Sequence, residues 1–126
     1  VDVLEELHQD YSLAVITNGN ADVYHPYVGL GQYFDFAVRA DQVGIAKPSV
    51  DLFSFAAKSA GVDLTQLIHI GDHPIDDVFG ASNAGARSVW FNRHGAQRWE
   101  DEWGGRSNAE VHSLLELPTV IRSLML

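Results

Sequence analysis

Two acidic residues, Asp72 and Asp77, follow an apolar run that ends at a glycine, in the stretch Ile68-His69-Ile70-Gly71-Asp72-His73-Pro74-Ile75-Asp76-Asp77-Val78. This order is typical of a buried parallel strand, a loop and the start of a helix. Both acids would then face the crevice at the carboxyl end of the strand, where open α/β sheets bind ligands. Neighbouring carboxylates repel each other unless a cation joins them, and Mg²⁺ prefers such oxygen ligands. Alternatively, the acids could simply complement the dipole at the helix N-terminus, which needs no metal.

Polar residues also end two other predicted strands. The apolar run of residues 12–17 precedes a turn signal, which places Thr17 and Asn18 at the carboxyl end of a strand. Lys47 follows the loop-like residues 40–46 and comes directly before a proline. A hydroxyl, an ammonium and a pair of carboxylates at one sheet edge would form an electrostatic clamp for a phosphoryl group. Taken singly, Thr17 could be a hydroxyl bonded to backbone and Lys47 a solvated surface lysine.

The remaining pattern alternates strands with helices. We expect helices over residues 1–8, 21–28, 50–60, 74–84 and 117–124, and strands over 12–17, 36–39, 67–70, 88–91 and 110–112. Ser49 is the expected N-cap of the third helix, which Gly61 ends, and Gly85 ends the fourth. Residues 92–108, with Trp99 and Trp103, are expected to form a loop over the strand ends. The alternation favours a doubly wound parallel α/β sheet in a single unit, residues 1–126.

Composition excludes several classes of partner and site. The chain has 126 residues, 46% of them hydrophobic and 20% charged, as in ordinary globular proteins. Its net charge of −9 disfavours nucleic acid and anionic membranes as general partners. With no cysteine, thiolate metal sites and cysteine nucleophiles are excluded. No apolar run reaches the length of a membrane span and no signal peptide is evident, so a cytoplasmic setting is expected.

Three motifs occur in a fixed order along the chain: Val15-Ile16-Thr17-Asn18-Gly19-Asn20, then Gly44-Ile45-Ala46-Lys47-Pro48 followed by Asp51-Leu52-Phe53, then Ile68-His69-Ile70-Gly71-Asp72 through Asp76-Asp77-Val78 with Gly80-Ala81 and Asn83-Ala84-Gly85. Together they resemble the second, third and fourth motifs of the haloacid dehalogenase superfamily. This resemblance covers nearly the whole chain and implies a Rossmann-like α/β core. The run Val89-Trp90-Phe91-Asn92-Arg93 further resembles the branch of flavin mononucleotide and pyrimidine-intermediate phosphatases.

The resemblance also implies roles for individual residues. Thr17 and the loop after it would bind phosphate oxygens, and Lys47 would offset developing charge. Asp72 would bind Mg²⁺, with Asp77 as its companion in the inner or outer shell of the metal. The expected site residues are therefore Thr17, Asn18, Gly19, Lys47, Asp72 and Asp77, of which Thr17, Lys47 and Asp72 are the expected catalytic ones.

The first motif of that superfamily, Asp-x-Asp-x-Thr or Val, is absent from these 126 residues. In the superfamily it supplies the nucleophile and the general acid/base. Residues 1–9 resemble the helix that returns from the cap. We therefore expect the chain to be the carboxyl-terminal part of a core that lacks its N-terminal central strand and is inactive alone. The complete protein would be a Mg²⁺-dependent hydrolase of small phosphorylated metabolites that forms an aspartyl-phosphate.

Three other functions share part of this pattern. Dehalogenases of the superfamily resemble each other in lacking the paired acids, and displacing halide needs no divalent metal, whereas a phosphate dianion does. A signalling receiver domain would present acids, then the hydroxyl, then the lysine, whereas this chain runs hydroxyl, lysine, acids. A non-catalytic phosphate-binding module is the third alternative, and the missing first motif is equally consistent with it.

Overall fold

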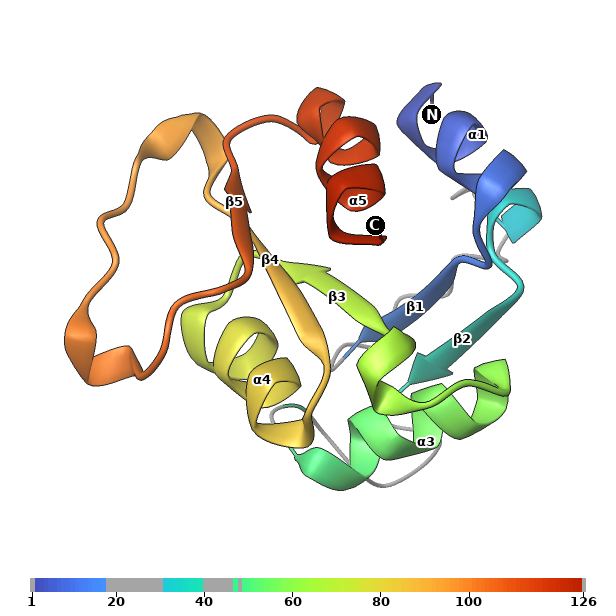
Figure 1. Ribbon diagram of the computed structural model, residues 1–126, viewed down its shortest axis with the longest axis horizontal. Coiled ribbons are helices and arrows are strands. Elements are labelled where there is room, and N and C mark those ends of the chain that lie inside the picture. The colour runs from blue at the N-terminus through green and yellow to red at the C-terminus, as the bar shows by residue number, and fades with distance from the viewer. Residues whose placement is uncertain (1, 18–30, 40–46, 48, 126) are drawn as a thin grey trace. The chain divides into compact units, whose positions relative to one another are not determined.

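The structure is a computed structural model that describes residues 2–17, 31–39, 47 and 49–125, and it combines helices with parallel strands (Figure 1). The internal contacts divide the chain into two units, residues 1–46 and 47–126. The expected helix over residues 21–28 and the loop over 40–46 lie outside the described residues. That the whole chain forms a single core segment stays a prediction.

The described part of the first unit contains one helix, one short 3₁₀ turn and a two-stranded parallel sheet. Helix α1 spans Asp2–Asp10, strand β1 Ala14–Thr17, turn η1 Gly31–Tyr33 and strand β2 Phe36–Arg39. The register places Ala14 opposite Phe36 and Thr17 opposite Arg39. Both predicted strands are confirmed, although the first begins two residues later than expected.

The second unit contains a three-stranded parallel sheet in the order β3-β4-β5. These strands span Ile68–Gly71, Arg87–Phe91 and Ala109–Val111. The central strand β4 carries three buried residues in a row, Ser88, Val89 and Trp90, as expected for a parallel strand covered on both faces. Its register places Trp90 opposite Gly71, the last residue of β3. The edge strand predicted at residues 110–112 is confirmed with a shift of one residue.

Helix α3, Val50–Ala60, begins and ends where its capping residues predict. The hydroxyl of Ser49 accepts a hydrogen bond from the backbone N–H of Asp51 at 3.3 Å, and Gly61 adopts a left-handed conformation with φ 72°. Its buried face consists of four residues at helical spacing: Leu52, Phe53, Ala56 and Ala57. This face supplies much of the apolar core of the second unit.

The helix after β3 opens as a π-helical turn and continues as an α-helix. The π-helical turn η3 spans Pro74–Phe79, and α4 spans Gly80–Ala84. The N–H of Val78 bonds to the carbonyl of His73 at 3.3 Å, a spacing of five residues. The expected end at Gly85 is confirmed, since this residue has φ 95°. The π-helical opening was not predictable from periodicity.

The closing helix α5, Leu117–Met125, lies on the opposite side of the β3-β4-β5 sheet from α3 and α4 (Figure 1). Four short 3₁₀ turns complete the second unit: η2 Leu64–Gln66, η4 Arg93–Gly95, η5 Asp101–Trp103 and η6 Leu114–Glu116. Helices with parallel strands confirm the predicted α/β class. Among the described strands, β1 pairs with β2 alone and β3 with β4 alone, so one edge of each has no partner there. No helix in the described ranges is long and apolar enough to cross a membrane.

Candidate functional site

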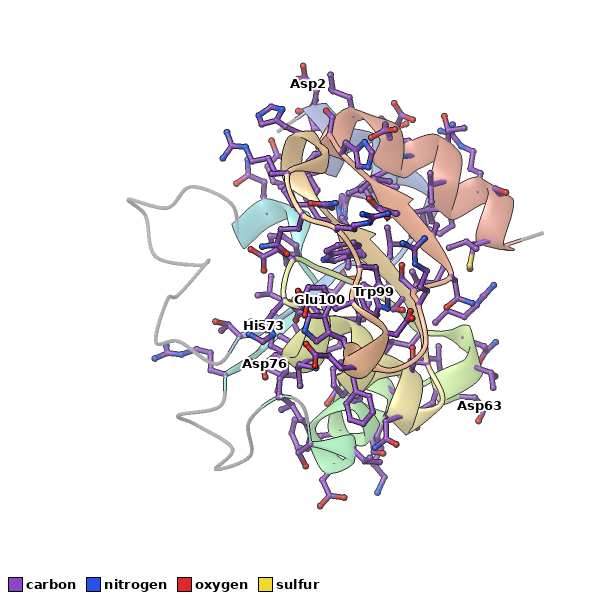
Figure 2. All side chains as sticks on the ribbon, turned by 90° about the vertical axis from the view of Figure 1, so that its left-hand side faces the viewer. Asp2, Asp63, His73, Asp76, Trp99 and Glu100 are labelled. Carbon is purple, nitrogen blue, oxygen red and sulfur yellow. The ribbon has the colours of Figure 1, made fainter. Side chains whose placement is uncertain are left out.

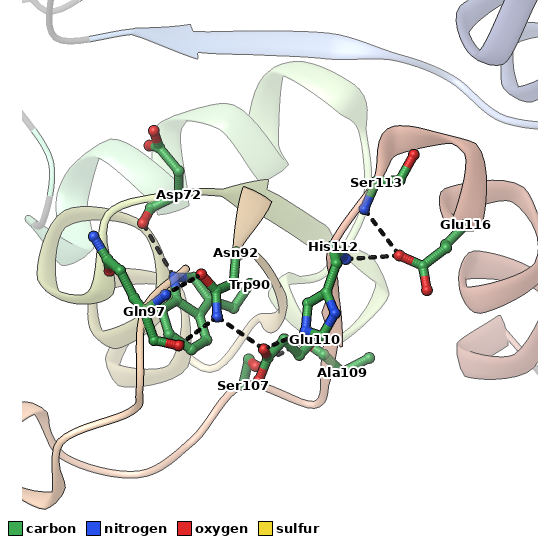
Figure 3. Close-up of polar contacts among 10 residues, drawn as sticks. All are labelled: Asp72, Trp90, Asn92, Gln97, Ser107, Ala109, Glu110, His112, Ser113 and Glu116. Carbon is green, nitrogen blue, oxygen red and sulfur yellow. Dashed lines mark hydrogen bonds and ion pairs between the residues drawn. The ribbon is translucent and has the colours of Figure 1, made fainter. Parts of the chain in front are cut away.

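The carboxyl end of β3 presents Asp72 at the surface. Its side chain is exposed, and its backbone carbonyl accepts a hydrogen bond from the indole N–H of Trp90 on β4 at 3.1 Å. Figure 3 shows the Asp72 carboxylate pointing away from that indole. The neighbouring strand therefore fixes the backbone of the loop, while the carboxylate remains directed outward.

Gly71, the last residue of β3, lies against the side chain of Asp77. A Cβ atom at position 71 would be 2.2 Å from Cγ of Asp77, closer than any real packing contact. The missing side chain therefore lets the Asp77 carboxylate return from the first helical turn onto the end of the strand. The glycine between the apolar strand and the acids is a steric requirement of this arrangement.

Asp77 is the centre of a buried network that consists of Lys47, His69 and Asp77. Its Oδ1 accepts hydrogen bonds from Lys47 Nζ at 2.6 Å and from His69 Nε2 at 2.8 Å, and its Oδ2 accepts one from the backbone N–H of His73 at 3.1 Å. Only 13%, 10% and 6% of the side chains of Lys47, His69 and Asp77 are exposed. An ionised carboxylate can only accept, so His69 carries a hydrogen on Nε2.

Electrostatics keep Asp77 ionised. Burial by itself would raise the pKa of this carboxyl, but the hydrogen bonds from His69 and Lys47, together with their charges, hold its pKa well below the usual range. The negative charge of Asp77 is therefore retained at neutral pH, where it can bind the Lys47 ammonium. A buried charge of this kind is tolerated because it is paired and hydrogen-bonded.

The two histidines near Asp72 have structural partners. The ring of His69 packs edge-on against Phe53 of α3, with ring centroids 5.1 Å apart and an interplanar angle of 79°. His73 caps the following helix, because its Nδ1 accepts hydrogen bonds from the backbone N–H groups of Ile75 and Asp76 at 3.2 and 3.0 Å. In this arrangement His73 serves as a helix cap and donates its backbone N–H to Asp77.

An aromatic cluster of Trp90, Trp99 and Trp103 covers the carboxyl end of β4. The three rings pack edge-to-face, with centroid distances of 5.1, 6.3 and 5.3 Å, and they contact buried Val78 of η3. In Figure 2, Trp99 and Glu100 lie on the same face of this unit as His73 and Asp76. The expected loop over the strand ends is thus packed against the helix that follows Asp72.

The same loop is tied to β5 by the side chain of Asn92. Its Nδ2 donates to the carbonyl of Gln97 at 2.7 Å and to Glu110 at 3.0 Å, and its Oδ1 accepts from the N–H of Gln97 at 3.0 Å (Figure 3). Asn92 is only 4% exposed, so these bonds satisfy a buried amide.

The two acids fit a divalent cation unequally. The exposed carboxylate of Asp72 is the type of hard oxygen ligand that Mg²⁺ prefers. Both oxygens of Asp77 already accept hydrogen bonds, which suits a supporting role in the outer shell. Within residues 2–17, 31–39, 47 and 49–125, no group of three or more His, Asp or Glu side chains could hold a metal ion. A complete cation site would therefore need further ligands beyond those described.

The structure brings together some of the residues that the sequence singles out. Lys47 and Asp77 are in direct contact, and Asp72 lies at the end of the strand that carries His69. Thr17 ends β1 in the first unit, and its convergence with the other residues stays a prediction. The predicted phosphate-binding residues Asn18 and Gly19 lie outside the described residues.

Sequence reasoning missed two contributors to this site. His69 interrupts an otherwise apolar strand, and a polar residue within such a run is a signal that it has a buried partner. Trp90 contributes its indole N–H, and a buried tryptophan normally bonds that group. Neither signal identifies the partner residue, because the partners, Asp77 for His69 and Asp72 for Trp90, are brought close only by the fold.

Comparison with known proteins supplies relatives for the chain. The profile of the haloacid dehalogenase-like hydrolase family matches residues 1–91. A 5-amino-6-(5-phospho-D-ribitylamino)uracil phosphatase, YigB of Escherichia coli, is 33% identical over 122 residues, which cover 95% of this chain and 50% of the relative. The chain thus spans about half the length of that relative.

Solved structures resemble the chain closely. The crystal structure of a 2-haloacid dehalogenase from Pseudomonas syringae superposes with a TM-score of 0.89 at 42% identity, over 97% of this chain and 51% of that one. A phosphatase structure from Thermococcus onnurineus superposes with a TM-score of 0.82 at 28% identity, over 96% of this chain and 55% of that one. A dehalogenase and a phosphatase are therefore both represented among its structural neighbours.

Proposed function

Because the chain belongs to the haloacid dehalogenase-like hydrolase family, we propose that it is the core part of a Mg²⁺-dependent phosphatase of small phosphorylated metabolites. The observation that carries the proposal is the arrangement at the end of β3. An exposed carboxylate, Asp72, follows the strand directly, and a buried carboxylate, Asp77, holds the ammonium of Lys47. A positive charge and a metal-binding acid at one strand end suit a phosphate dianion.

The residues of this chain would bind and orient the phosphate, while the nucleophile would come from outside the segment. An aspartate there would attack phosphorus, displace the alcohol of the ester and form an aspartyl-phosphate, which water then hydrolyses to the free aspartate and inorganic phosphate. When bound, Mg²⁺ supplies positive charge that offsets the charge of the phosphate. Asp72 would hold that ion, Lys47 would offset charge that develops on the phosphoryl oxygens, and Thr17, Asn18 and Gly19 would bind those oxygens.

A 2-haloacid dehalogenase is the second candidate, and the 42% identity to the Pseudomonas syringae structure favours it. Displacement of halide by a carboxylate requires no divalent metal, so an exposed acid beside the strand end would have no task in that reaction. Asp72 is such an acid. The relative YigB, a phosphatase by name, supports the first candidate, and with the resemblance of residues 89–93 it favours flavin or pyrimidine phosphates as substrates.

A substrate panel on the full-length protein separates these functions. We expect phosphate release from phosphomonoesters, including flavin mononucleotide and pyrimidine nucleotides, that requires Mg²⁺ and stops with EDTA. Halide release from 2-haloacids that is unaffected by EDTA would instead establish the dehalogenase. A protein that binds phosphate esters without turnover would be the non-catalytic module.

The expected cytoplasmic setting is part of this proposal.

Two variants test the assigned roles in the active protein. Lys47→Ala should lower the rate by about 10²–10³, the usual scale for one electrostatic donor at a reacting group. A loss below roughly threefold would remove Lys47 from the site, since that is far less than such a donor contributes. Asp72→Asn should abolish both activity and its response to Mg²⁺, and an unaltered Mg²⁺ titration would refute its role as a ligand.

A further inference from the structure

His69 is a buried histidine that contacts the carboxylate of Asp77, and that carboxylate in turn binds Lys47. The histidine is 9% exposed, and its Nε2 lies 2.8 Å from the Asp77 oxygen that also binds Lys47. We propose that His69 is a positioning residue that holds the Lys47 ammonium at the end of β3 by fixing the Asp77 carboxylate. Its contribution to catalysis rests on the phosphatase function proposed above, whereas its effect on Lys47 does not.

Lysine needs an external acceptor to be held in one place. Its ammonium is a point charge on a flexible four-carbon stem, without the rigid donor geometry of arginine. In this site Oδ1 of Asp77 is such an acceptor, at 2.6 Å from Nζ. The position of the Asp77 carboxylate therefore helps to set the position of the Lys47 ammonium.

The Asp77 carboxylate is fixed at both of its oxygens. His69 donates to Oδ1, and the backbone N–H of His73 donates to Oδ2 at 3.1 Å. Without His69, Oδ1 would keep Lys47 as its hydrogen-bond donor from the described residues, and the carboxylate would be fixed less firmly. The donor from His69 is thus the contact that ties Oδ1 to the rigid sheet.

His69 is itself held from the core side. Its backbone is in β3, and its ring packs edge-on against Phe53, which has no exposed surface. A continuous series of contacts therefore runs from α3 through His69 and Asp77 to Lys47. Preorganisation of this kind is what an electrostatic site requires, because a donor that must reorient loses much of its effect.

Three substitutions separate donation from packing. His69→Gln keeps an N–H donor at nearly the reach of Nε2, whereas His69→Leu keeps similar bulk without a donor. Ser88→Ala is the matched control, because Ser88 is fully buried and lies opposite His69 in the β3–β4 register. Its hydroxyl lies 3.5 Å from that of Ser82 and takes no part in the buried network.

The reactivity of Lys47 reports its position directly. These 126 residues contain only two lysines, and the other, Lys58, is exposed on α3 and serves as the internal reference. Reductive methylation of the full-length protein with formaldehyde and a borohydride, followed by peptide mass spectrometry, gives the ratio of the Lys47 rate to the Lys58 rate. We expect this ratio to rise about tenfold in His69→Leu, the factor that one hydrogen bond to a charged group contributes.

The conservative variants decide the interpretation. In His69→Gln and Ser88→Ala the ratio should stay within about twofold of wild type, because the donor to Asp77 is retained. An unchanged ratio in His69→Leu, or an equal rise in the Gln and Leu variants, would overturn the proposal. Should His69→Leu not fold, His69→Asn replaces it with the same expected rise, since its amide stops one carbon short of Nε2.

Kinetics with a phosphate ester adds the catalytic readout. In His69→Leu, kcat should fall by about tenfold with KM nearly unchanged, and His69→Gln should recover most of the loss. A fall in KM and kcat that Gln does not rescue would contradict a positioning role. A wild-type protein without phosphatase activity would refute the proposed function, while the labelling ratios would still decide whether His69 positions Lys47.

Discussion

Asp72 and Asp77 lie five positions apart in the sequence, but Asp72 is exposed to solvent and Asp77 is buried. Asp72 is on the exposed tip of the loop after β3, and its carboxylate points away from its neighbours (Figure 3). Asp77 is 4% exposed, and its carboxylate accepts hydrogen bonds from Lys47, His69 and the backbone of His73. The same side chain thus occurs once where it can bind a ligand and once where its bonding capacity is already used.

This difference shows how one short segment can supply both chemistry and rigidity. An exposed acid can exchange water for a cation at little cost, whereas a buried acid must be paired to remain charged. The glycine between strand and loop joins the two regions, because it allows Asp77 to pack where a Cβ of residue 71 would be. Asp72 at the exposed tip would bind a cation, and the buried network would hold the ammonium of Lys47 beside it.

The largest expected effect on stability distinguishes the two acids. Asp77→Ala should lower the free energy of unfolding of the full-length protein by about 3–5 kcal/mol, because the largely buried Lys47 ammonium loses the carboxylate that pairs with it. Asp72→Ala, at the exposed tip, should change it by no more than about 0.5 kcal/mol. Urea denaturation followed by circular dichroism measures both, and equal losses would remove the contrast between the two sites.

A smaller loss of stability is expected at Gly71, which lies between the exposed loop and the buried network. Gly71→Ala introduces a methyl group 2.2 Å from Cγ of Asp77, so the carboxylate or the strand must move, at a cost of about 1–3 kcal/mol. Gly105→Ala is the matched control, because no atom of the described residues lies within 4 Å of its Cβ position, and it should be nearly neutral. Thermal unfolding of both variants tests the close approach, which an indistinguishable pair would disprove.

The bond from Trp90 to the Asp72 carbonyl should contribute about 1 kcal/mol, the usual value for a neutral hydrogen bond. Trp90→Phe removes this donor, and Trp99→Phe, the control, trims the same aromatic cluster while losing a bond to Gly104 instead. Both should lose similar stability, but only Trp90→Phe should alter the Mg²⁺ dependence of activity. A change in both variants would mean that the cluster, and not this bond, positions Asp72.

The smallest expected effect is on the pH dependence of the free energy of unfolding, because the contribution of Asp77 does not change with pH near neutrality. The pKa of Asp77 is depressed in the folded state, so its stabilisation is fully present above the pKa of an unfolded aspartate, about 3.9, and is lost as the pH falls further. Below that value the unfolded chain takes up a proton that folded Asp77 resists. The acid-induced fall in the free energy of unfolding should therefore be shallower in Asp77→Asn, and identical pH profiles would show that Asp77 is unperturbed.

The sequence predicted the elements of the second unit because their signals are local. Ser49 and Gly61 bound α3 by capping chemistry that involves residues close in the chain. The position of Asp72 after β3 follows from the apolar run and the glycine that precede it. Such features depend on backbone conformation within a few residues and are readable without the fold.

The partners within the site were less predictable because they are distant in sequence. Lys47 and Asp77 are 30 positions apart, and whether Asp77 faces a metal or a lysine depends on how the helix after β3 begins. That helix begins with a π-helical turn, which no periodicity indicated. The role of His69 likewise depends on which face of β3 turns toward η3.

Metal binding by the full-length protein is the decisive measurement for the roles of Asp72 and Asp77. Calorimetric titration with Mg²⁺ should show that Asp72→Asn does not bind over the range that saturates wild type. Asp77→Asn should still bind, about 10–100-fold more weakly, the scale on which partners in the outer shell act. If Asp72→Asn binds Mg²⁺ as wild type does, the exposed tip is not a metal site, and the division of roles between the two acids is wrong.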